Sequence, residues 1–365
     1  MKDFSSVSEA CLKFTTEDSE PFEPQGYSLL ESESVYTRAR LILGTIMEFR
    51  RSPDAHLSCD VSCRSCHSPH IAKIITAIKT NERITLVLPA FPGKSPNLSK
   101  VLSPLPDLAE QLALEFLEQL CGRIRDVYTP GAQIILCSDG RVFSDIVGMR
   151  ETDVTEYQRG LTQLIAKLGL KNISTFNLDE SFGGKNFHQM RQELMEQFGV
   201  PQEVLRKKIL RGSKGQGGLD DVEAHRMYCG ITRFLVEDST FPGQTKSRSA
   251  IQKEGKTKAY EVIRRSNAWS ELIAQRFPRA IRLSIHPQTC GSKKLGIRLI
   301  GAESWMTPWH GVAVKTDKGF ILLKRTEAEA LGARLIFSVT GRPSHFELPS
   351  NKSFLVKLKE AEVLA

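Results

Sequence analysis

Short apolar runs alternate with longer amphipathic stretches through the first half of the chain. The runs lie at 84–88, 133–137 and 172–176, and short runs of this kind are typical of strands covered on both faces. Between the first two, apolar residues recur every four positions from Leu108 to Ile124, which predicts a helix. A strand, a crossover helix and a second strand make a right-handed unit with parallel strands. The pattern therefore predicts an α/β fold with a mostly parallel sheet flanked by helices.

Further helices are predicted where apolar residues return at helical spacing. These segments are 36–49, a helix following Ser68, 157–168 and the long basic segment 251–276. Residues 187–237 also read as helices, with charged faces and a glycine-rich interruption at 212–218. We expect this region to be a helical insertion in the core.

Beyond Pro278 the pattern becomes strand-like. The predicted strands are 280–285, 295–300, 311–315, 320–323 and 334–339. We expect them to extend the first sheet or to form a second small sheet packed on it. The predicted organisation is an acidic arm at 1–33, a core at 34–277 and a strand-rich part at 278–365.

Composition indicates an ordinary globular protein. Hydrophobic residues make up 40% of the 365 residues and charged residues 25%. No segment reaches the roughly 20 apolar residues that a membrane span needs, and the first residues lack the apolar core of a signal peptide. The 8 cysteines are too scattered for a disulfide framework. We therefore expect a cytoplasmic protein that has no membrane contact.

The loop after the first predicted strand, residues 89–97, carries one cation among hydrogen-bonding side chains. Its 3 prolines exclude a regular element, and loops at the carboxyl ends of strands are where open α/β sheets bind ligands. Lys94, Ser95 and Asn97 can all donate to anionic oxygens. They suit a phosphate or a carboxylate, and a rigid surface turn with a solvated lysine is the alternative.

A second loop follows the next strand, at residues 138–145. Asp139 could accept a proton there, with Arg141 and Asp145 beside it. The alternative is an aspartate that bonds its own backbone in a turn. Because parallel strands end at one edge of a sheet, we expect Lys94, Asp139 and Arg141 to share a rim.

The segment 244–298 is strongly basic, with 13 Lys or Arg against 3 acids. Such a tract attracts an anion, although it lacks the interleaved aromatics and motifs of nucleic-acid binders. Arg264 and Arg265 point about 100° apart on a helix, so only one of them should face a ligand. His286 and His310 each stand beside a proline at a strand end, and either could act as an acid or base.

Three further cysteines cluster as Cys59, Cys63 and Cys66, followed directly by His67. Thiolates and imidazole are zinc or iron ligands, and this spacing permits a structural metal. No second CxxC pair accompanies them. Ordinary reduced cysteines near a helix start are the alternative that we favour, so no metal is expected.

Several of these segments together resemble the pyoverdine/dityrosine biosynthesis family, which includes the isocyanide (isonitrile) synthases. The matching blocks are Leu88-Pro-Ala-Phe-Pro-Gly-Lys-Ser-Pro-Asn97, Cys137-Ser-Asp-Gly-Arg-Val-Phe-Ser-Asp145, Arg265-Ser-Asn-Ala-Trp269, Ile281-Arg-Leu-Ser-Ile-His-Pro287 and Trp305-Met-Thr-Pro-Trp-His310. The likeness extends from about Ser62 to Glu329.

The resemblance implies a Rossmann-like α/β enzyme that condenses the amine of an aromatic L-amino acid, tyrosine or tryptophan, with ribulose 5-phosphate. In such enzymes the second carbon of the sugar becomes the isocyanide carbon, phosphate is released and no redox cofactor is needed. An enzyme that forms N-formyl tyrosine, or a non-catalytic phosphate- or nucleic-acid-binding protein, is the alternative.

On this resemblance we expect cations to hold the anionic groups, Asp139 to take protons from the amine and a histidine to donate to departing oxygens. The expected catalytic residues are Lys94, Asp139 and His310; the expected substrate-binding residues are Ser95, Asn97, Arg141, Asp145, Arg264, Arg265, Arg282 and His286.

Overall fold

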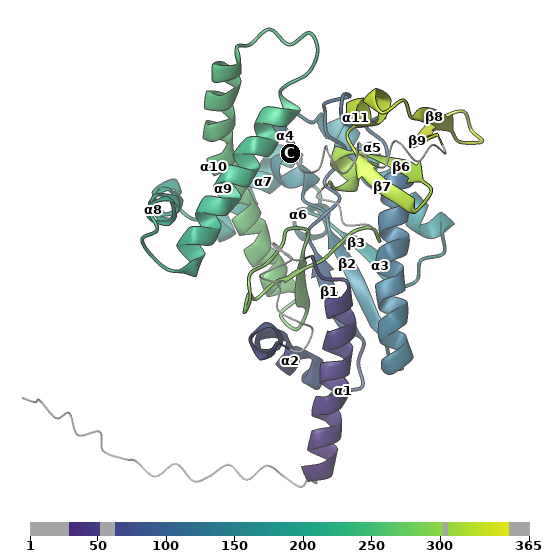
Figure 1. Ribbon diagram of the computed structural model, residues 1–365. Helices are drawn as coiled ribbons and strands as arrows, with labels where there is room; N and C mark the ends of the chain where they lie inside the picture. Colours follow the sequence, from purple (N-terminus) through teal and green to yellow (C-terminus); the bar gives the residue numbers. More distant parts are fainter. Residues whose placement is uncertain (1–28, 52–62, 302–305, 350–365) are drawn as a thin grey trace, which may run out of the picture.

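The first sheet is parallel and lies at the centre of the protein (Figure 1). The computed structural model describes residues 29–51, 63–301 and 306–349. The 5 strands of the first sheet run in the order β3-β2-β1-β4-β5, and every neighbouring pair is parallel. The strands are β1 Ile84–Leu88, β2 Ala132–Cys137, β3 Ile173–Phe176, β4 Ile281–Ser284 and β5 Leu295–Gly296. The strand order reverses between β1 and β4, the switch point at which such sheets bind ligands. The predicted α/β fold, Rossmann-like with a mostly parallel sheet, is confirmed.

Helices cover both faces of this sheet, as the doubly apolar strands require. Leu86 of β1 packs in a core formed with α1, α2, α3 and α5. Its neighbour Val87 points the other way, into a core formed with α4, α7, α9 and α10. The helices are α1 Leu29–Glu48, α2 Arg64–Lys79, α3 Leu108–Val127, α4 Gly140–Val147, α5 Glu151–Lys167, α6 Asp179–Phe182, α7 Phe187–Phe198, α8 Gln202–Ser213, α9 Leu219–Asp238 and α10 Arg248–Arg276.

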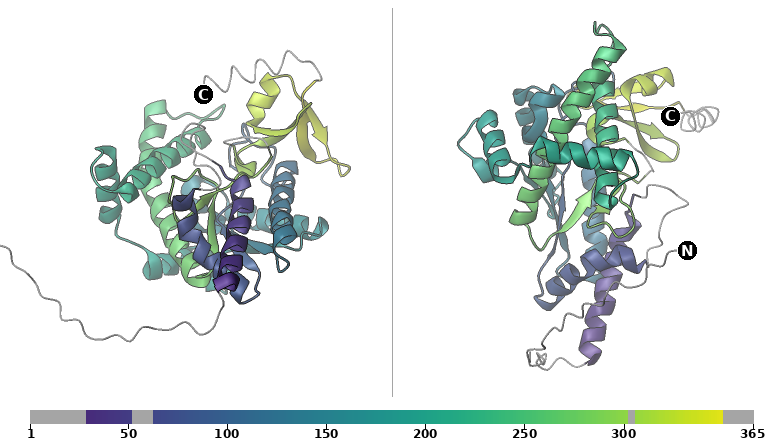
Figure 2. Two further views of the ribbon diagram at one scale, coloured as in Figure 1. Left: turned by 60° about the horizontal axis from the view of Figure 1, so that its bottom comes forward. Right: turned by 90° about the vertical axis from the view of Figure 1, so that its left-hand side faces the viewer.

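A second, mixed sheet lies beside the first at the start of α3 (Figure 2). Its order is β7-β6-β9-β8, and Ala313 and Leu322 pack on Leu108 and Ala109 of α3. Its elements are β6 Val312–Thr316, β7 Gly319–Leu323, α11 Arg325–Ala330, β8 Arg334–Phe337 and β9 Pro343–Glu347, preceded by the short helix η1 Pro308–His310. The strands beyond Pro278 were expected to extend the first sheet or to form a second one. Both occur, because β4 and β5 extend the first sheet and the later strands form the second.

Some boundaries differ from the sequence pattern. The loop predicted after β2 contains the helix α4, and α1 begins at Leu29, inside the predicted arm. Residues 1–28 of that arm lie outside the described residues. Only Leu295–Gly296 of the strand predicted at 295–300 is in the sheet. Among the described residues no helix has the length and apolar character that crossing a membrane would need.

The loops after β1 and β2 touch at Gly140. A Cβ atom added to Gly140 would lie 1.8 Å from the carbonyl oxygen of Pro92. Because that oxygen is backbone, no side-chain movement can relieve the clash. Gly140 is therefore what allows the two loops to meet at the edge of the sheet.

We predict that Gly140→Ala destabilises the protein by several kcal/mol, about 3 or more, because the β1 loop must move away from α4. Gly122→Ala is the matched control, since Gly122 also lies in a helix and its added Cβ would meet nothing within 4 Å. That variant should gain about 0.5–1 kcal/mol from helix propensity. Urea unfolding measures both, and equal effects would contradict the close-approach role of Gly140.

Candidate active site

Lys94 lies at the centre of a buried ion triad. Its Nζ is 2.9 Å from Asp107 Oδ2 and 2.9 Å from Glu110 Oε2, and all three side chains are at most 3% exposed. Lys94 also donates to the carbonyl oxygen of Pro308 at 2.9 Å, and Tyr157 donates to Glu110 at 3.2 Å. The triad joins the β1 loop, the start of α3, η1 and α5. Lys94 is thus turned into the protein, which differs from the ligand-facing position that the sequence suggested.

The charged groups of the triad shift the pKa values of one another. Burial alone would lower the pKa of Lys94, but the two carboxylates outweigh burial and raise its pKa, so the ammonium stays charged. Burial raises the pKa of Glu110 to about 7, although Lys94 pulls in the opposite direction. Asp107 and Glu110 also form the capping box of α3. The sequence carried this signal, because the Asp-x-x-Glu spacing marks a helix start, but it gave no sign that Lys94 would join it.

Ser95 and Asn97 hold the end of α9. Ser95 donates to Asp238 Oδ1 at 2.9 Å, and Asn97 donates to the carbonyl oxygens of Glu237 and Thr240 at 3.1 and 3.0 Å. Both side chains are buried. The two polar residues expected to bind substrate therefore make their hydrogen bonds within the protein.

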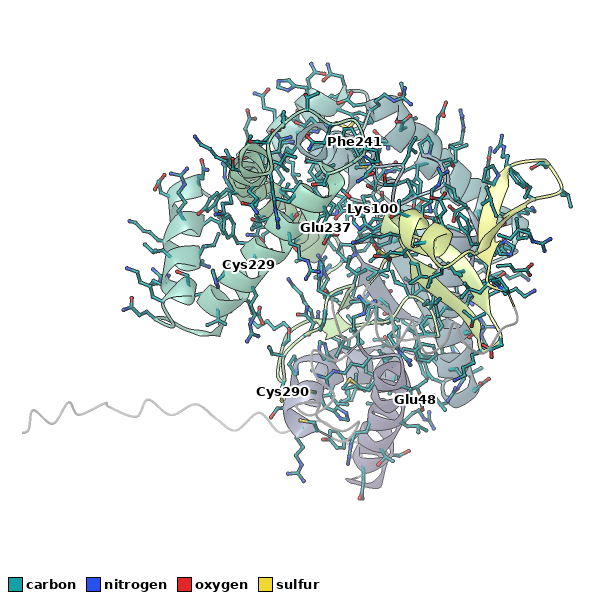
Figure 3. The ribbon with its side chains drawn as sticks, turned by 45° about the horizontal axis from the view of Figure 1, so that its top comes forward. Glu48, Lys100, Cys229, Glu237, Phe241 and Cys290 are labelled. Carbon is teal, nitrogen blue, oxygen red and sulfur yellow. The ribbon has the colours of Figure 1, made fainter. Side chains whose placement is uncertain are left out.

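Further polar side chains lie close to Asp238. Lys100 Nζ lies 2.5 Å from Asp238 Oδ1, and the Lys100 and Glu237 side chains are 3.9 Å apart (Figure 3). His310 Nε2 is 3.9 Å from Asp238 Oδ2, while its Nδ1 is 3.0 Å from the Thr307 hydroxyl. Burial lowers the pKa of His310 to about 4, so this imidazole is neutral at pH 7.

Asp139 stands at the carboxyl end of β2, directly before α4. Its side chain is partly exposed, makes no capping hydrogen bond to α4 and has a buried Oδ1 without a hydrogen-bond partner. Burial raises the pKa of Asp139 to about 7, even though a hydrogen bond from its own backbone and, less strongly, Arg282 of β4 pull it down. That hydrogen bond is the one expected of an aspartate in a turn. A carboxyl group that changes charge near neutral pH can accept a proton and return it.

Two side chains of the β4–β5 loop extend this arrangement. Burial lowers the pKa of Lys294, which lies within electrostatic range of Arg282. His286 is exposed to solvent, yet the surrounding protein, with Arg51 and Lys294, lowers its pKa to about 4. We call Asp139, Arg282, His286 and Lys294 the switch-point cluster, because β1 and β4 flank the reversal of strand order.

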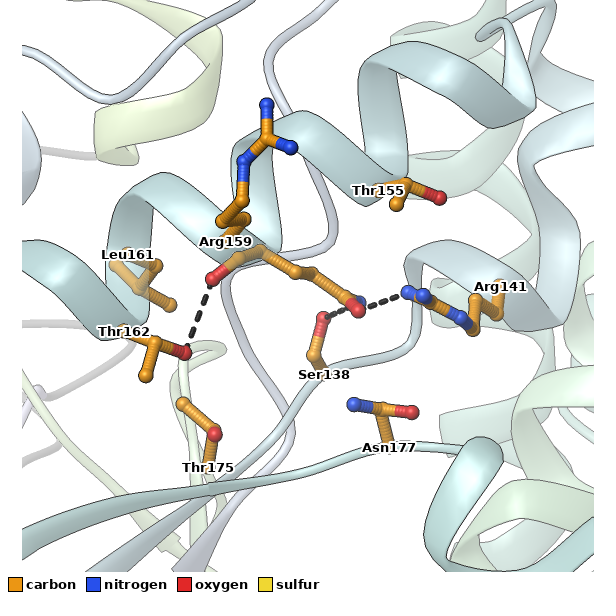
Figure 4. A pocket seen from close by; sticks show the side chains of 9 residues that line it. Ser138, Arg141, Thr155, Arg159, Leu161, Thr162, Thr175 and Asn177 are labelled. Carbon is orange, nitrogen blue, oxygen red and sulfur yellow. Dashed lines mark hydrogen bonds between the residues drawn. The ribbon is translucent and has the colours of Figure 1, made fainter. Parts of the chain in front are cut away.

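A pocket of about 250 Å³ opens at the carboxyl ends of β2 and β3 (Figure 4). Asp139 does not line it, although Ser138 and Arg141 on either side of Asp139 in the sequence do. Arg141 and Arg159 reach it from α4 and α5. Arg141 is also paired with Asp179 at 2.9 Å and hydrogen-bonded to Gln158. The remaining lining is mostly hydroxyl and amide groups: Ser138, Thr155, Gln158, Thr162, Thr175 and Asn177, with Leu161. Sequence reasoning missed Arg159, since nothing in the α5 pattern distinguished it from a solvated helix face.

The remaining predicted substrate contacts pair with each other or with neighbours. Arg265 lies 2.8 Å from Asp145 and 3.1 Å from Glu261. Arg264 pairs with Glu261 at 2.7 Å. Arg282 donates to Ser270 at 2.8 Å from within the sheet. Of the expected site residues, Asp139 and Arg282 lie within electrostatic range of each other, and His286 is linked to them only through Lys294. Lys94, Ser95 and Asn97 have partners within the protein.

The cysteine cluster is partly assembled by the fold. Cys63 and Cys66, at the start of α2, meet Cys290 of the β4–β5 loop, with their sulfur atoms within 4.8 Å of one another. His67 is buried nearby in α2. Cys59 lies outside the described residues. Sequence reasoning missed Cys290, because no spacing rule connects it to the other two.

Comparison with known proteins gives the geometry its context. The model of the family described as pyoverdine/dityrosine biosynthesis protein matches residues 74–336. An L-tyrosine isonitrile synthase of Pseudomonas aeruginosa is 42% identical over 319 residues, covering 86% of this chain and 94% of the relative. An L-tryptophan isonitrile synthase of Fischerella ambigua is 41% identical over 313 residues, covering 86% and 89%.

The fold has a solved counterpart. The crystal structure of the PvcA protein from Pseudomonas aeruginosa superposes with a TM-score of 0.77 at 41% identity, covering 86% of this chain and 100% of that one. These matches confirm the family resemblance that the sequence blocks indicated.

We predict that Lys94→Met lowers the free energy of unfolding by about 3–5 kcal/mol, because two buried carboxylates lose the cation that they share. The loss should be smaller at pH 5 than at pH 8, since Glu110, whose pKa is about 7, is protonated at the lower pH. Lys315→Met is the control: Lys315 pairs with Glu347 at 2.8 Å on the surface and should contribute less than about 1 kcal/mol. Similar losses in the two variants, by urea unfolding, would contradict the triad.

Proposed function

The chain belongs to the pyoverdine/dityrosine biosynthesis family, and on that premise we propose that it is an isonitrile synthase. Identity of about 40% across 86% of the chain to synthases of this name is the observation that carries the proposal. The alternative of a non-catalytic phosphate- or nucleic-acid-binding protein gives Asp139 no role. A cytoplasmic location and the lack of a nucleic-acid partner stay predictions.

The proposed substrates are an aromatic L-amino acid, tyrosine or tryptophan, and ribulose 5-phosphate, with phosphate released and no redox cofactor. The lining of the pocket of about 250 Å³ suits a small polyhydroxylated anion, because it combines two guanidinium groups with hydroxyl and amide groups. Arg282 and Lys294 of the switch-point cluster supply cations for a second anionic group, such as the amino-acid carboxylate.

Asp139 is the proposed proton carrier. Attack of an amine on the sugar carbonyl requires the nitrogen to lose its protons and the carbonyl oxygen to leave as water. A carboxyl group with a pKa of about 7 takes up the first proton as a carboxylate and delivers it as an acid. His286 and His310, each with a pKa of about 4, are neutral at pH 7. We therefore assign them hydrogen bonding to substrate oxygens rather than the role of a cationic acid.

The other predicted residues receive different roles. Lys94, Ser95 and Asn97 are positioning residues, because their hydrogen bonds and ion pairs fix the β1 loop to α3 and α9. Arg265 positions α4 through Asp145 and the carbonyl oxygen of Val142, and Arg264 stays on the outer side of α10 with Glu261. The catalytic role expected of Lys94 itself stays a prediction.

We predict that the purified protein converts tyrosine or tryptophan to the isonitrile only when ribulose 5-phosphate is present. Mass spectrometry of the product, after trapping of the isocyanide, measures the reaction. Carbon-13 at the second carbon of the sugar should appear in the isocyanide group. A product with the mass of an N-formyl amino acid, or no product from either amino acid, would overturn the synthase assignment.

We predict that Asp139→Asn lowers kcat by about 10²–10⁴-fold, as loss of a general acid–base does, while leaving the protein folded. In the wild type, the folded-state pKa of about 7 lies above the ordinary value of 3.8. The folded state therefore binds the extra proton, and stability falls as pH rises between these values. The amide cannot ionise, so the variant should be more stable than the wild type at pH 8, by on the order of 1–2 kcal/mol after solvent screening.

Asp317→Asn, in the exposed turn between β6 and β7, is the matched control for both measurements. It should change neither kcat nor the pH dependence of unfolding. If Asp139→Asn kept full activity, or lost stability at pH 8 relative to pH 5, the assignment of Asp139 would be wrong.

A further inference from the structure

Three thiols from two distant parts of the chain converge at the edge of the molecule next to α2. Cys63 and Cys66 are at the start of α2, while Cys290 is 227 positions away from Cys63, in the β4–β5 loop. Their sulfur atoms all lie within 4.8 Å of one another. Figure 3 shows Cys290 near the α2 end of the molecule, apart from Cys229 on α9. Within the described residues this is the only such group of cysteine, histidine or carboxylate ligand atoms.

The sulfur spacing matches the edge of a tetrahedral metal site. With a Zn–S bond of about 2.3 Å, two thiolates on a tetrahedral ion lie about 3.8 Å apart. The Cys63 and Cys290 sulfur atoms are 3.7 Å apart. A disulfide would need about 2.05 Å. Cys63 and Cys290 are therefore already spaced for an ion between them, and the sulfur atom of Cys66 lies within 4.8 Å of both.

The backbone conformation at the start of α2 and in the β4–β5 loop directs the sulfur atoms toward one another. Cys63 is the N-cap of α2, where the partial positive charge of a helix start favours thiolates. Cys290 is followed by Gly291 with φ of +78°, a conformation that glycine adopts without strain. Gly291 thus turns the loop back so that Cys290 faces α2.

A small hollow lies against the same sulfur cluster. Its volume is about 10 Å³. This is about the space that a single water molecule occupies. Of the three thiols only Cys66 lines the hollow, together with Gln288, Thr289 and Ser292 of the Cys290 loop and the cations Arg50 and Lys294. A structural zinc site is usually four-coordinate, so a fourth ligand would complete the three thiolates among the described residues.

We propose that Cys63, Cys66 and Cys290 bind a thiophilic divalent metal ion of the Zn²⁺ class, which fastens the β4–β5 loop to α2. Binding displaces the thiol protons to solvent and involves no change of oxidation state. The fastened loop is the one that carries His286 and Lys294 of the switch-point cluster. The ion is structural in this proposal, and it does not depend on the proposed reaction.

Titration of the reduced, metal-stripped full chain with Co²⁺ tests the site. Thiolate-bound Co²⁺ gives a sulfur-to-metal charge-transfer band in the near ultraviolet and strong tetrahedral bands in the visible. We expect the bands to saturate at about one equivalent and to disappear when Zn²⁺ is added. Zn²⁺ should also raise the Tm of the wild type, because it binds the folded state.

Cys290→Ser is the informative variant, because Cys290 is exposed on a loop and its replacement leaves the core untouched. We expect it to lose the charge-transfer band, to bind Co²⁺ at least about tenfold more weakly and to lose the Zn²⁺-dependent rise in Tm. Cys63→Ser should behave in the same way. Cys229→Ser, an exposed cysteine outside the cluster, is the control and should bind as the wild type does.

Several results would overturn the proposal. Wild-type protein with titratable thiols but no thiolate–Co²⁺ band would do so, as would a band that survives in both Cys290→Ser and Cys63→Ser. A Cys63–Cys290 disulfide in metal-free protein isolated under mild reduction would also replace the metal site by a redox pair. Circular dichroism of each variant separates loss of ligand from loss of fold.

Discussion

One buried cation holds this structure together at the point where its parts meet. Lys94 balances Asp107 and Glu110 in an environment that excludes water, and through them it links the β1 loop, the start of α3, η1 and α5. A buried ion pair contributes little net stability by itself. Its importance lies in the cost of breaking it, because any movement of the β1 loop would leave two desolvated carboxylates without their cation.

With the β1 loop held in this way, the other elements around the switch point take their places. Ser95 and Asn97 attach the end of α9, and the contact between Pro92 and Gly140 sets where α4 begins. Asp139 then stands at the edge of the sheet, desolvated and opposite Arg282. Desolvation raises the pKa of this carboxyl group to about 7, which suits proton transfer near neutral pH. Above that pH the desolvated carboxylate lowers the stability of the fold.

The sequence predicted the position of a candidate site residue only where that residue lies at the end of a predicted strand. Asp139, Arg282 and His286 follow or belong to short apolar strands, so their place at one edge could be read from the order of elements. Lys94 also follows a strand, yet it points inward, because its partners belong to a helix cap whose role looked complete without it. Arg159 and Lys294 had no distinguishing signal, since a lysine or arginine on a polar face is usually solvated.

The sequence by itself determined the alternation of strands and helices, the parallel first sheet and the family, because these depend on local periodicity and on contiguous blocks of residues. Tertiary structure alone decided which polar groups face inward. Lys94 meets Pro308 across 214 positions, and Cys290 meets Cys63 across 227. Pairing at such separations is set by how layers pack and what water is excluded, and no local pattern encodes it.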